Sequence, residues 1–156
     1  MSTRKEMVWL IGHPGAGKTS MVQALFPDVG DSYTIIHFDL LRLAIHGEPY
    51  IHQMEGHVDT VACAMAGHAL LSGRSVIIDE AITTPGTARA LSDVAARHNA
   101  SLRIIHINAD INVCRERRVP RTMPAEDFDR KVTEWGMFGK MILGMGDTVE
   151  TRIVKG

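Results

Sequence analysis

The 156-residue chain is poor in cysteine and has almost no net charge. Its two cysteines, Cys63 and Cys114, form neither a Cys-x-x-Cys pair nor a metal-finger spacing, so no disulfide framework is expected and a reducing cytosol is the natural compartment. Seventeen basic residues against eighteen acidic ones give a formal charge of -1, which excludes a global positive field toward nucleic acid or anionic lipid. Any binding site for a polyanion must therefore be local.

Long apolar runs are also absent. The first apolar run, residues 7–11, ends at Gly12 and is too short for a signal peptide or a membrane span, so a cytoplasmic protein without a membrane partner is expected. The chain has no internal repeat, low-complexity tract or clear linker. Its length and its 45% hydrophobic content are typical of one globular domain, and we take residues 1–156 as that domain.

Short apolar segments alternate with helix-periodic segments along the chain. The predicted strands are 7–11, 33–38, 75–78, 102–108 and 149–154. The predicted helices are 18–25, 40–45, 58–71, 85–97, 111–118 and 125–138, with a loop over 46–56. This alternation predicts a single-domain α/β fold with an open, mostly parallel sheet covered by helices on both faces. Ligands bind such sheets at the C-terminal ends of the strands.

A phosphate-binding motif follows the first predicted strand. Residues 12–19 read Gly-His-Pro-Gly-Ala-Gly-Lys-Thr and fit the pattern G-x-x-x-x-G-K-[ST]. Its glycines let successive backbone N–H groups turn toward a phosphate at the start of a helix. Lys18 is expected as an exposed loop charge near the β- and γ-phosphates, with Thr19 on Mg²⁺ and Ser20 near the α-phosphate. The predicted nucleotide-binding residues are Gly12, Gly15, Ala16, Gly17, Lys18, Thr19 and Ser20.

Two acids follow the strand predicted over 75–78. Asp79 is the candidate for orienting the Mg²⁺ shell beside the phosphate loop, so Thr19 and Asp79 are the predicted metal residues. Glu80 has two open interpretations. It could orient an attacking water, as in an ATPase, or it could be a solvated acid that opens a loop.

Asp39 and Arg42 follow the strand predicted over 33–38, at the same edge of the sheet. An acceptor hydroxyl needs an anion that orients it and takes its proton, so Asp39 is a candidate general base. Alternatively, Asp39 only caps the helix that begins at Leu40. Arg42 shares a helix face with Asp39 and could bind either an acceptor anion or the Asp39 carboxylate itself.

Four arginines crowd the segment 115–121, in which Glu116 is the only acid. Guanidinium groups that close over a transferring phosphoryl group stabilise its negative charge. Arg117 and Arg121 lie one helical turn apart and are predicted to face the nucleotide as catalytic residues beside Lys18 and Asp39. The alternative is a solvated basic helix end.

Four of these features together carry a resemblance: residues 12–19, the Asp39-x-x-Arg42 step, Val76-Ile77-Ile78-Asp79 and Arg117-x-x-x-Arg121. In these features the chain resembles the P-loop kinases of the phage-type polynucleotide kinase-like family, which includes the zeta toxin-like P-loop ATPase domains. The resemblance implies a sheet order of 2-3-1-4-5, with ATP and Mg²⁺ as cofactors. It also implies that Asp39 is the general base, that Arg42 contacts an acceptor phosphate, and that an arginine-bearing lid lies around 111–124. The chain departs from the family at Ala81, where relatives commonly carry asparagine.

The leading functional hypothesis is a kinase that moves the γ-phosphate of ATP to a hydroxyl on nucleic acid. The acceptor would be a 5′-hydroxyl or a hydroxymethyl group on a DNA base. The alternatives are a kinase of a nucleoside monophosphate or small metabolite, an ATP-hydrolysing switch or motor subunit, and a nucleotide-binding module without catalysis. The sequence leaves the oligomeric state open.

Overall fold

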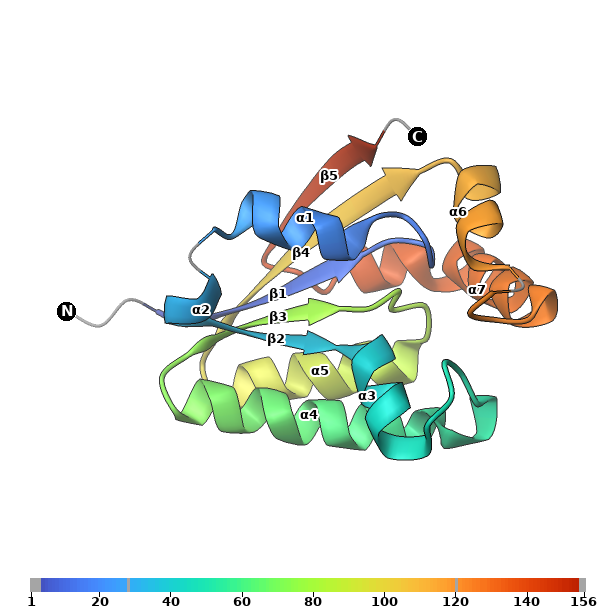
Figure 1. Cartoon of the computed structure of the whole chain (residues 1–156). Helices are drawn as coiled ribbons and strands as arrows, with labels where there is room; N and C mark the ends of the chain where they lie inside the picture. The colour runs from blue at the N-terminus through green and yellow to red at the C-terminus, as the bar shows by residue number, and fades with distance from the viewer. Residues whose placement is uncertain (1–3, 28, 120, 155–156) are drawn as a thin grey trace.

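The computed structural model describes residues 4–27, 29–119 and 121–154. Five strands form one sheet: β1 Glu6–Ile11, β2 Tyr33–His37, β3 Ser75–Asp79, β4 Ser101–Ala109 and β5 Thr148–Val154. All of them pair in parallel, in the order β2-β3-β1-β4-β5 (Figure 1). The predicted α/β fold class and sheet order are therefore confirmed. The domain predicted over 1–156 also includes residues 1–3, 28, 120, 155 and 156, which lie outside the described residues.

The six predicted helices are all present, with four displaced ends, whereas a short helix over 29–32 and a 3₁₀ helix over 52–54 were not predicted. The helices are α1 Lys18–Leu25, α2 Val29–Ser32, α3 Phe38–His46, α4 Glu55–Leu71, α5 Pro85–Arg97, α6 Ile111–Arg118 and α7 Ala125–Leu143, and a 3₁₀ helix spans His52–Met54. α3 begins at Phe38, so Asp39 lies in its first turn. α4 begins at Glu55, inside the predicted loop. α7 continues past Phe138 to Leu143, because Ile142 beyond it is buried in the core.

The central strand β1 is buried on both faces. Met7 and Trp9 pack on one face with residues of α4 and α5, whereas Val8 and Leu10 pack on the other with residues of α1 and α6. Figure 1 shows α4 and α5 on one side of the sheet and α1 on the opposite side. Burial of both faces is what a parallel sheet requires, and it explains why β1 reads as a continuous apolar run.

Strand register places the ends of β1, β2 and β3 together. Leu10 of β1 and His37 of β2 both align with Asp79 of β3. The phosphate loop, the first turn of α3 and the residues after β3 therefore leave the sheet side by side. This edge is where a ligand is expected in such a fold.

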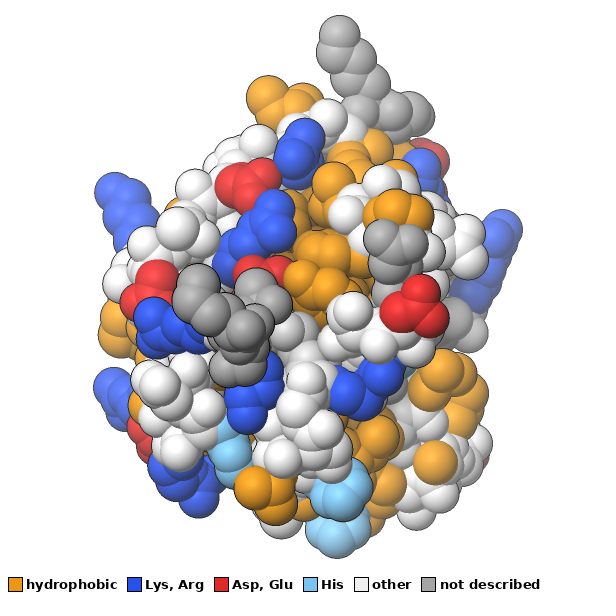
Figure 2. Space-filling view, turned by 90° about the vertical axis from the view of Figure 1, so that its left-hand side faces the viewer, with side chains coloured by type: hydrophobic (Ala, Val, Ile, Leu, Met, Phe, Trp, Pro, Cys, Tyr) orange, Lys and Arg blue, Asp and Glu red, His pale blue; other side chains and the backbone are white. Residues whose placement is uncertain are grey.

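The opposite end of the sheet, where the strands begin, is shown in Figure 2, with basic and acidic side chains interspersed among apolar ones. Arg103 Nη2 there lies 2.6 Å from Glu150 Oε1, and Tyr33 donates a hydrogen bond of 2.5 Å to Glu6. At this end of the sheet, acidic side chains therefore lie beside the basic and polar groups that bind them. Among the described residues, no helix combines the length and the apolar character that crossing a membrane requires.

Candidate active site

The loop between β1 and α1 depends on its glycines. Gly15 and Gly17 have positive φ angles of 86° and 91°, which other residues rarely adopt. A Cβ atom on Gly15 would lie 2.7 Å from the carbonyl oxygen of Cys114, and one on Gly12 would lie 2.8 Å from that of Ile107. The loop is thus packed directly against α6 and the end of β4.

Lys18 is the first residue of α1, and only 9% of its surface is exposed. Its ammonium donates hydrogen bonds to the carbonyl oxygens of Gly12 at 3.0 Å and His13 at 3.1 Å. The expectation of an exposed loop charge is therefore wrong, because the side chain folds back over the loop. Burial lowers the pKa of Lys18, and the carboxylates of Asp79 and Glu80 partly offset that effect.

The two predicted metal residues are in direct contact. Thr19 Oγ1 donates a hydrogen bond of 2.9 Å to Asp79 Oδ2. His37 Nε2 lies 3.1 Å from the same hydroxyl and 3.5 Å from the same carboxylate oxygen. Because the single hydroxyl proton of Thr19 goes to Asp79, His37 must supply the proton of its own contact with Thr19. No sequence motif predicted His37 here.

This pair fits Mg²⁺, which prefers oxygen ligands. Mg²⁺ usually keeps several waters and uses one or two carboxylates together with substrate phosphates. Among the described residues, no three acidic, histidine or cysteine side chains are placed to hold a metal ion by themselves. Thr19 and Asp79 would therefore hold the ion together with the phosphates of a nucleotide.

Arg42 is buried, with 2% of its surface exposed, and three carboxylates surround it. Its guanidinium donates to Asp39 Oδ1 at 2.8 Å and to the two oxygens of Glu55 at 2.7 and 3.0 Å, and it pairs with Glu80. The structure thus favours the second expected role of Arg42, binding the Asp39 carboxylate. The role implied by resemblance, contact with an acceptor phosphate, stays a prediction, although each guanidinium nitrogen already contacts a carboxylate.

Glu80 is not the solvated acid of the second interpretation, because only 12% of its side chain is exposed and it pairs with Arg42. The first interpretation, orientation of an attacking water, stays a prediction. Burial alone would raise the pKa of Glu80, but the charges of Arg42 and Lys131 lower it from 4.5 to about 2. Glu80 is therefore a fixed negative charge that holds Arg42 in place.

This shift predicts acid sensitivity. A carboxylate whose folded-state pKa is depressed stabilises the fold above its unfolded pKa, and this contribution disappears as the pH falls toward the folded pKa. For Glu80 the effect is on the order of 3 kcal/mol. We expect the free energy of unfolding of the wild type to fall more steeply between about pH 5 and pH 3 than that of Glu80→Gln. Urea titrations at several pH values measure this, and parallel pH profiles would contradict it.

The arginine segment reaches the site through a different pair than expected. Arg117 Nη1 donates to the carbonyl oxygen of Gly15 at 2.9 Å, and Arg118 Nη2 lies 3.0 Å from Asp39 Oδ2. α6 ends at Arg118, so Arg121 does not continue its face; Arg121 is exposed and does not line the cavity. The expected Arg117 and Arg121 pair is therefore replaced by Arg117 and Arg118. The lid predicted around 111–124 includes residue 120, which lies outside the described residues.

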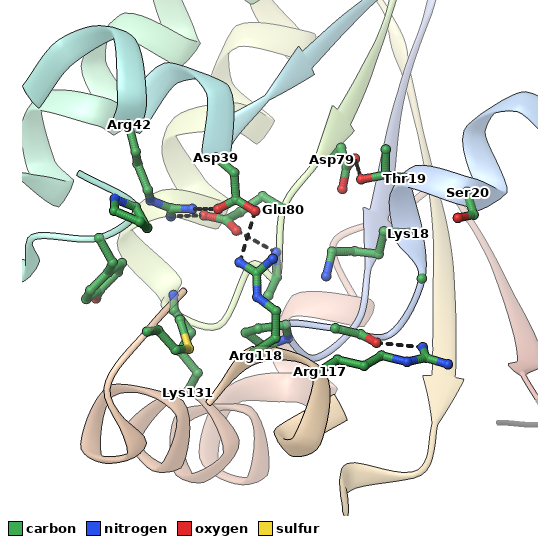
Figure 3. A pocket seen from close by; sticks show the side chains of 17 residues that line it. Lys18, Thr19, Ser20, Asp39, Arg42, Asp79, Glu80, Arg117, Arg118 and Lys131 are labelled. Carbon is green, nitrogen blue, oxygen red and sulfur yellow. Dashed lines mark hydrogen bonds and ion pairs between the residues drawn. The ribbon is translucent and has the colours of Figure 1, made fainter. Parts of the chain in front are cut away.

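These side chains line a cavity of about 410 Å³ at the C-terminal edge of the sheet (Figure 3). Of the predicted nucleotide-binding residues, those that line it are Gly15, Gly17, Lys18, Thr19 and Ser20. Gly12 and the buried Ala16 lie behind them in the loop. Asp39, Arg42 and Asp79 line the cavity as well, so most of the predicted site converges on one place.

The lining residues that the sequence analysis did not name include Pro49, Tyr50, Met123 and Lys131. Lys131 of α7 is 7% exposed, and its ammonium lies 5.1 Å from the centre of the Tyr50 ring. Both residues belong to segments far from any recognised motif. No local signal singles out Lys131, because its helix face also carries Asp127 and Glu134.

A family model described as an AAA domain matches residues 7–137. No curated protein matches the sequence. Among solved structures, a protein of Chloroflexus aurantiacus described as a candidate kinase is similar, with a TM-score of 0.71 and 18% identity over 97% of this chain and 89% of that one. APS kinase CysC of Mycobacterium tuberculosis, solved with AMPPNP and APS, has a TM-score of 0.61 and 16% identity over 95% and 88% of the two chains.

A chain of the Pnkp1/Rnl/Hen1 RNA repair complex is also similar in structure, with a TM-score of 0.65 and 18% identity. The match covers 90% of this chain but only 47% of the repair chain, so the present chain spans less than half of that protein's length. At these identities the likeness concerns the fold alone.

Proposed function

Since this chain belongs to the AAA domain family, we propose that it is an ATP- and Mg²⁺-dependent phosphotransferase whose acceptor is a hydroxyl group. The observation that carries the proposal is the placement of Asp39. Two guanidinium groups hold its carboxylate, one on each oxygen, and it lines the same cavity as Lys18. A carboxylate has about four lone-pair positions, so two remain for a hydroxyl.

In the proposed reaction, the acceptor oxygen attacks the γ-phosphorus of ATP. A new P–O bond forms, the bond from the γ-phosphorus to the β,γ-bridging oxygen breaks, and ADP leaves with that electron pair. Asp39 takes the proton of the acceptor hydroxyl. Lys18, Arg117 and Arg118 surround the phosphoryl group with positive charge. Mg²⁺, held by Thr19 and Asp79, would neutralise the β- and γ-phosphate oxygens.

The state of Glu80 favours phosphoryl transfer over ATP hydrolysis. The alternative of an ATP-hydrolysing switch or motor relied on Glu80 to orient water. Arg42 holds that carboxylate instead, and its proton affinity is low. Of the two carboxylates, Asp39 is the more accessible to an acceptor, with 37% of its side chain exposed against 12% for Glu80.

The acceptor has two candidate classes. A small metabolite is favoured because Arg42, on which docking of a polynucleotide phosphate relied, is enclosed by carboxylates. A nucleic acid acceptor is the second candidate. It is supported by the exposed Arg117 and by the fold that this chain shares with a chain of an RNA repair complex.

Transfer of label from γ-labelled ATP to oligonucleotides, nucleosides and small alcohols tests both classes. Label transfer to a polynucleotide that is contacted through its phosphates would fall steeply as the salt concentration rises, whereas transfer to a small uncharged acceptor would be nearly insensitive to salt. Label in no acceptor at all would contradict the proposed function.

Arg118 provides a sharper test, because its neighbour Arg121 offers a matched control. We expect Arg118→Ala to lower turnover by about 10²-fold, since it removes both a cation at the phosphoryl group and one of the two contacts that orient Asp39. ATP affinity should change much less. Arg121→Ala should retain wild-type turnover. Equal effects of the two substitutions would contradict the assignment of Arg118.

A further inference from the structure

A second, smaller cavity opens beside the cavity lined by Lys18 and Asp39, which we call the nucleotide cavity. Its volume is about 100 Å³, and it shares Tyr50, Glu80, Ala81 and Lys131 with the larger one. At roughly 30 Å³ per water molecule, this space is that of about three waters. A compound of about six non-hydrogen atoms fits such a space, whereas a nucleobase with its sugar does not.

Lys131 marks the junction of the two cavities. It is nine-tenths buried and makes no hydrogen bond or ion pair with any residue that the structure describes. Figure 3 shows it rising from α7 toward the side of the site that holds Glu80. The Lys131 ammonium faces the Tyr50 ring but contacts no oxygen of a described residue, so its hydrogen-bond donors are available for an oxygen that a substrate brings.

Two further acids, Asp59 and Glu134, line the small cavity, and Glu134 lies one helical turn from Lys131 on α7. Asp59 Oδ2 accepts a hydrogen bond of 2.6 Å from Thr87, and in the described part of the chain its other oxygen has no donor. Glu134, which also lines this cavity, has no hydrogen-bond donor among the described residues either. Burial raises the pKa of Asp59, and the charge of Glu55 adds to that effect. Unlike Glu55 and Glu80, which pair with Arg42, Asp59 and Glu134 form no ion pair with any described residue, although the charge of Arg42 acts on Asp59 and that of Arg130 on Glu134.

A metal ion does not account for the missing positive charge. Within residues 4–27, 29–119 and 121–154, no three acidic, histidine or cysteine side chains are arranged to hold one. The cavity also has room for more than a single ion. An organic ammonium group satisfies both the charge and the volume.

We infer that the small cavity is the acceptor subsite and that it takes an amino alcohol of about six non-hydrogen atoms. Its hydroxyl would lie at the Lys131 end, toward Asp39, and its ammonium between Asp59 and Glu134. The inference rests on the proposed phosphotransfer. In the reaction, the hydroxyl oxygen bonds to the γ-phosphorus, ADP leaves, and the hydroxyl proton passes to Asp39, while the ammonium group is unchanged.

Three probes of nearly equal size and different charge test this inference. These are 2-amino-1,3-propanediol, glycerol and glycerate, which carry one positive, no and one negative charge. Calorimetric titration of each probe into the protein loaded with Mg²⁺ and a non-hydrolysable ATP analogue measures binding without turnover. We expect the amino alcohol to bind at least about tenfold more tightly than glycerol, and glycerate to bind most weakly. Equal binding of the three, or preference for glycerate, would overturn the inference.

Substitutions of the two acids test whether they cause the preference for the positively charged probe. Asp59→Asn should lower the affinity for the amino alcohol to about that of glycerol. Glu134→Gln should lower this affinity as well, and it serves as the test if Asp59→Asn does not fold. Asp93→Asn, which removes an exposed acid on α5, is the matched control and should bind like the wild type. An unchanged charge preference in both cavity variants would overturn the inference.

Failure of this inference is distinguishable from failure of the proposed function. Binding of the ATP analogue, together with label transfer only to an oligonucleotide, would overturn the amino alcohol and leave the kinase standing. Absence of nucleotide binding would overturn the proposed function itself.

Discussion

Lys18→Ala should lower phosphoryl transfer on the order of 10³-fold while leaving the fold intact. The ammonium is the cation placed on the phosphate loop itself, where its hydrogen bonds within the described part of the chain go to the loop carbonyl oxygens of Gly12 and His13. Its proposed partner is charge on the γ-phosphate, and the loss of such a donor typically costs 10²- to 10³-fold or more. Alanine is also a good first-turn residue, so α1 should still form.

Turnover with γ-labelled ATP measures the effect, and circular dichroism with thermal melting confirms the fold. Lys140→Ala is the matched control, because Lys140 is an exposed lysine on α7 away from the cavity. Turnover near the wild-type value in Lys18→Ala would contradict the kinase assignment.

Asp39→Asn should lower kcat by about 10²- to 10⁴-fold while ATP binding is retained. That range is typical of the loss of a general base. Asparagine has nearly the same shape and keeps one oxygen for Arg42, but its amide cannot take a proton. It also cannot accept hydrogen bonds from both Arg42 and Arg118 as the carboxylate does.

The diagnostic for Asp39 is the split between kcat and nucleotide affinity. Asp31→Asn, at an exposed acid of α2, controls for the loss of one negative charge. A large loss of ATP affinity in Asp39→Asn would make Asp39 a nucleotide-binding or structural residue. An unchanged kcat would exclude it as the base.

Much of the fold could be predicted because its signals are local. Apolar runs that end in glycine or an acid, alternating with helix-periodic segments, predicted the parallel sheet, and resemblance supplied its order. The contact between Thr19 and Asp79 was also predictable, since a motif of known geometry and a strand end meet at one edge.

The residues that the sequence did not predict depend on contacts between distant segments. Of the two roles expected for Arg42, the structure favours binding of carboxylate, because Glu55 and Glu80, 13 and 38 residues later, fold onto it beside Asp39. Arg118 reaches Asp39 across 79 residues, and only the end of α6 decides that it, rather than Arg121, enters the cavity. Lys131 belongs to α7, whose approach to the site no local pattern encodes.

The fate of the γ-phosphate tests the central claim most directly. ADP and labelled products can be followed in one time course with γ-labelled ATP and Mg²⁺, first without an acceptor and then with the acceptors named above. The account predicts slow ADP formation without acceptor, and with the right acceptor a large acceleration in which each ADP is matched by one labelled acceptor molecule. Fast release of free phosphate at a rate that no acceptor changes, with label in no acceptor, would contradict it and establish an ATP-hydrolysing protein instead.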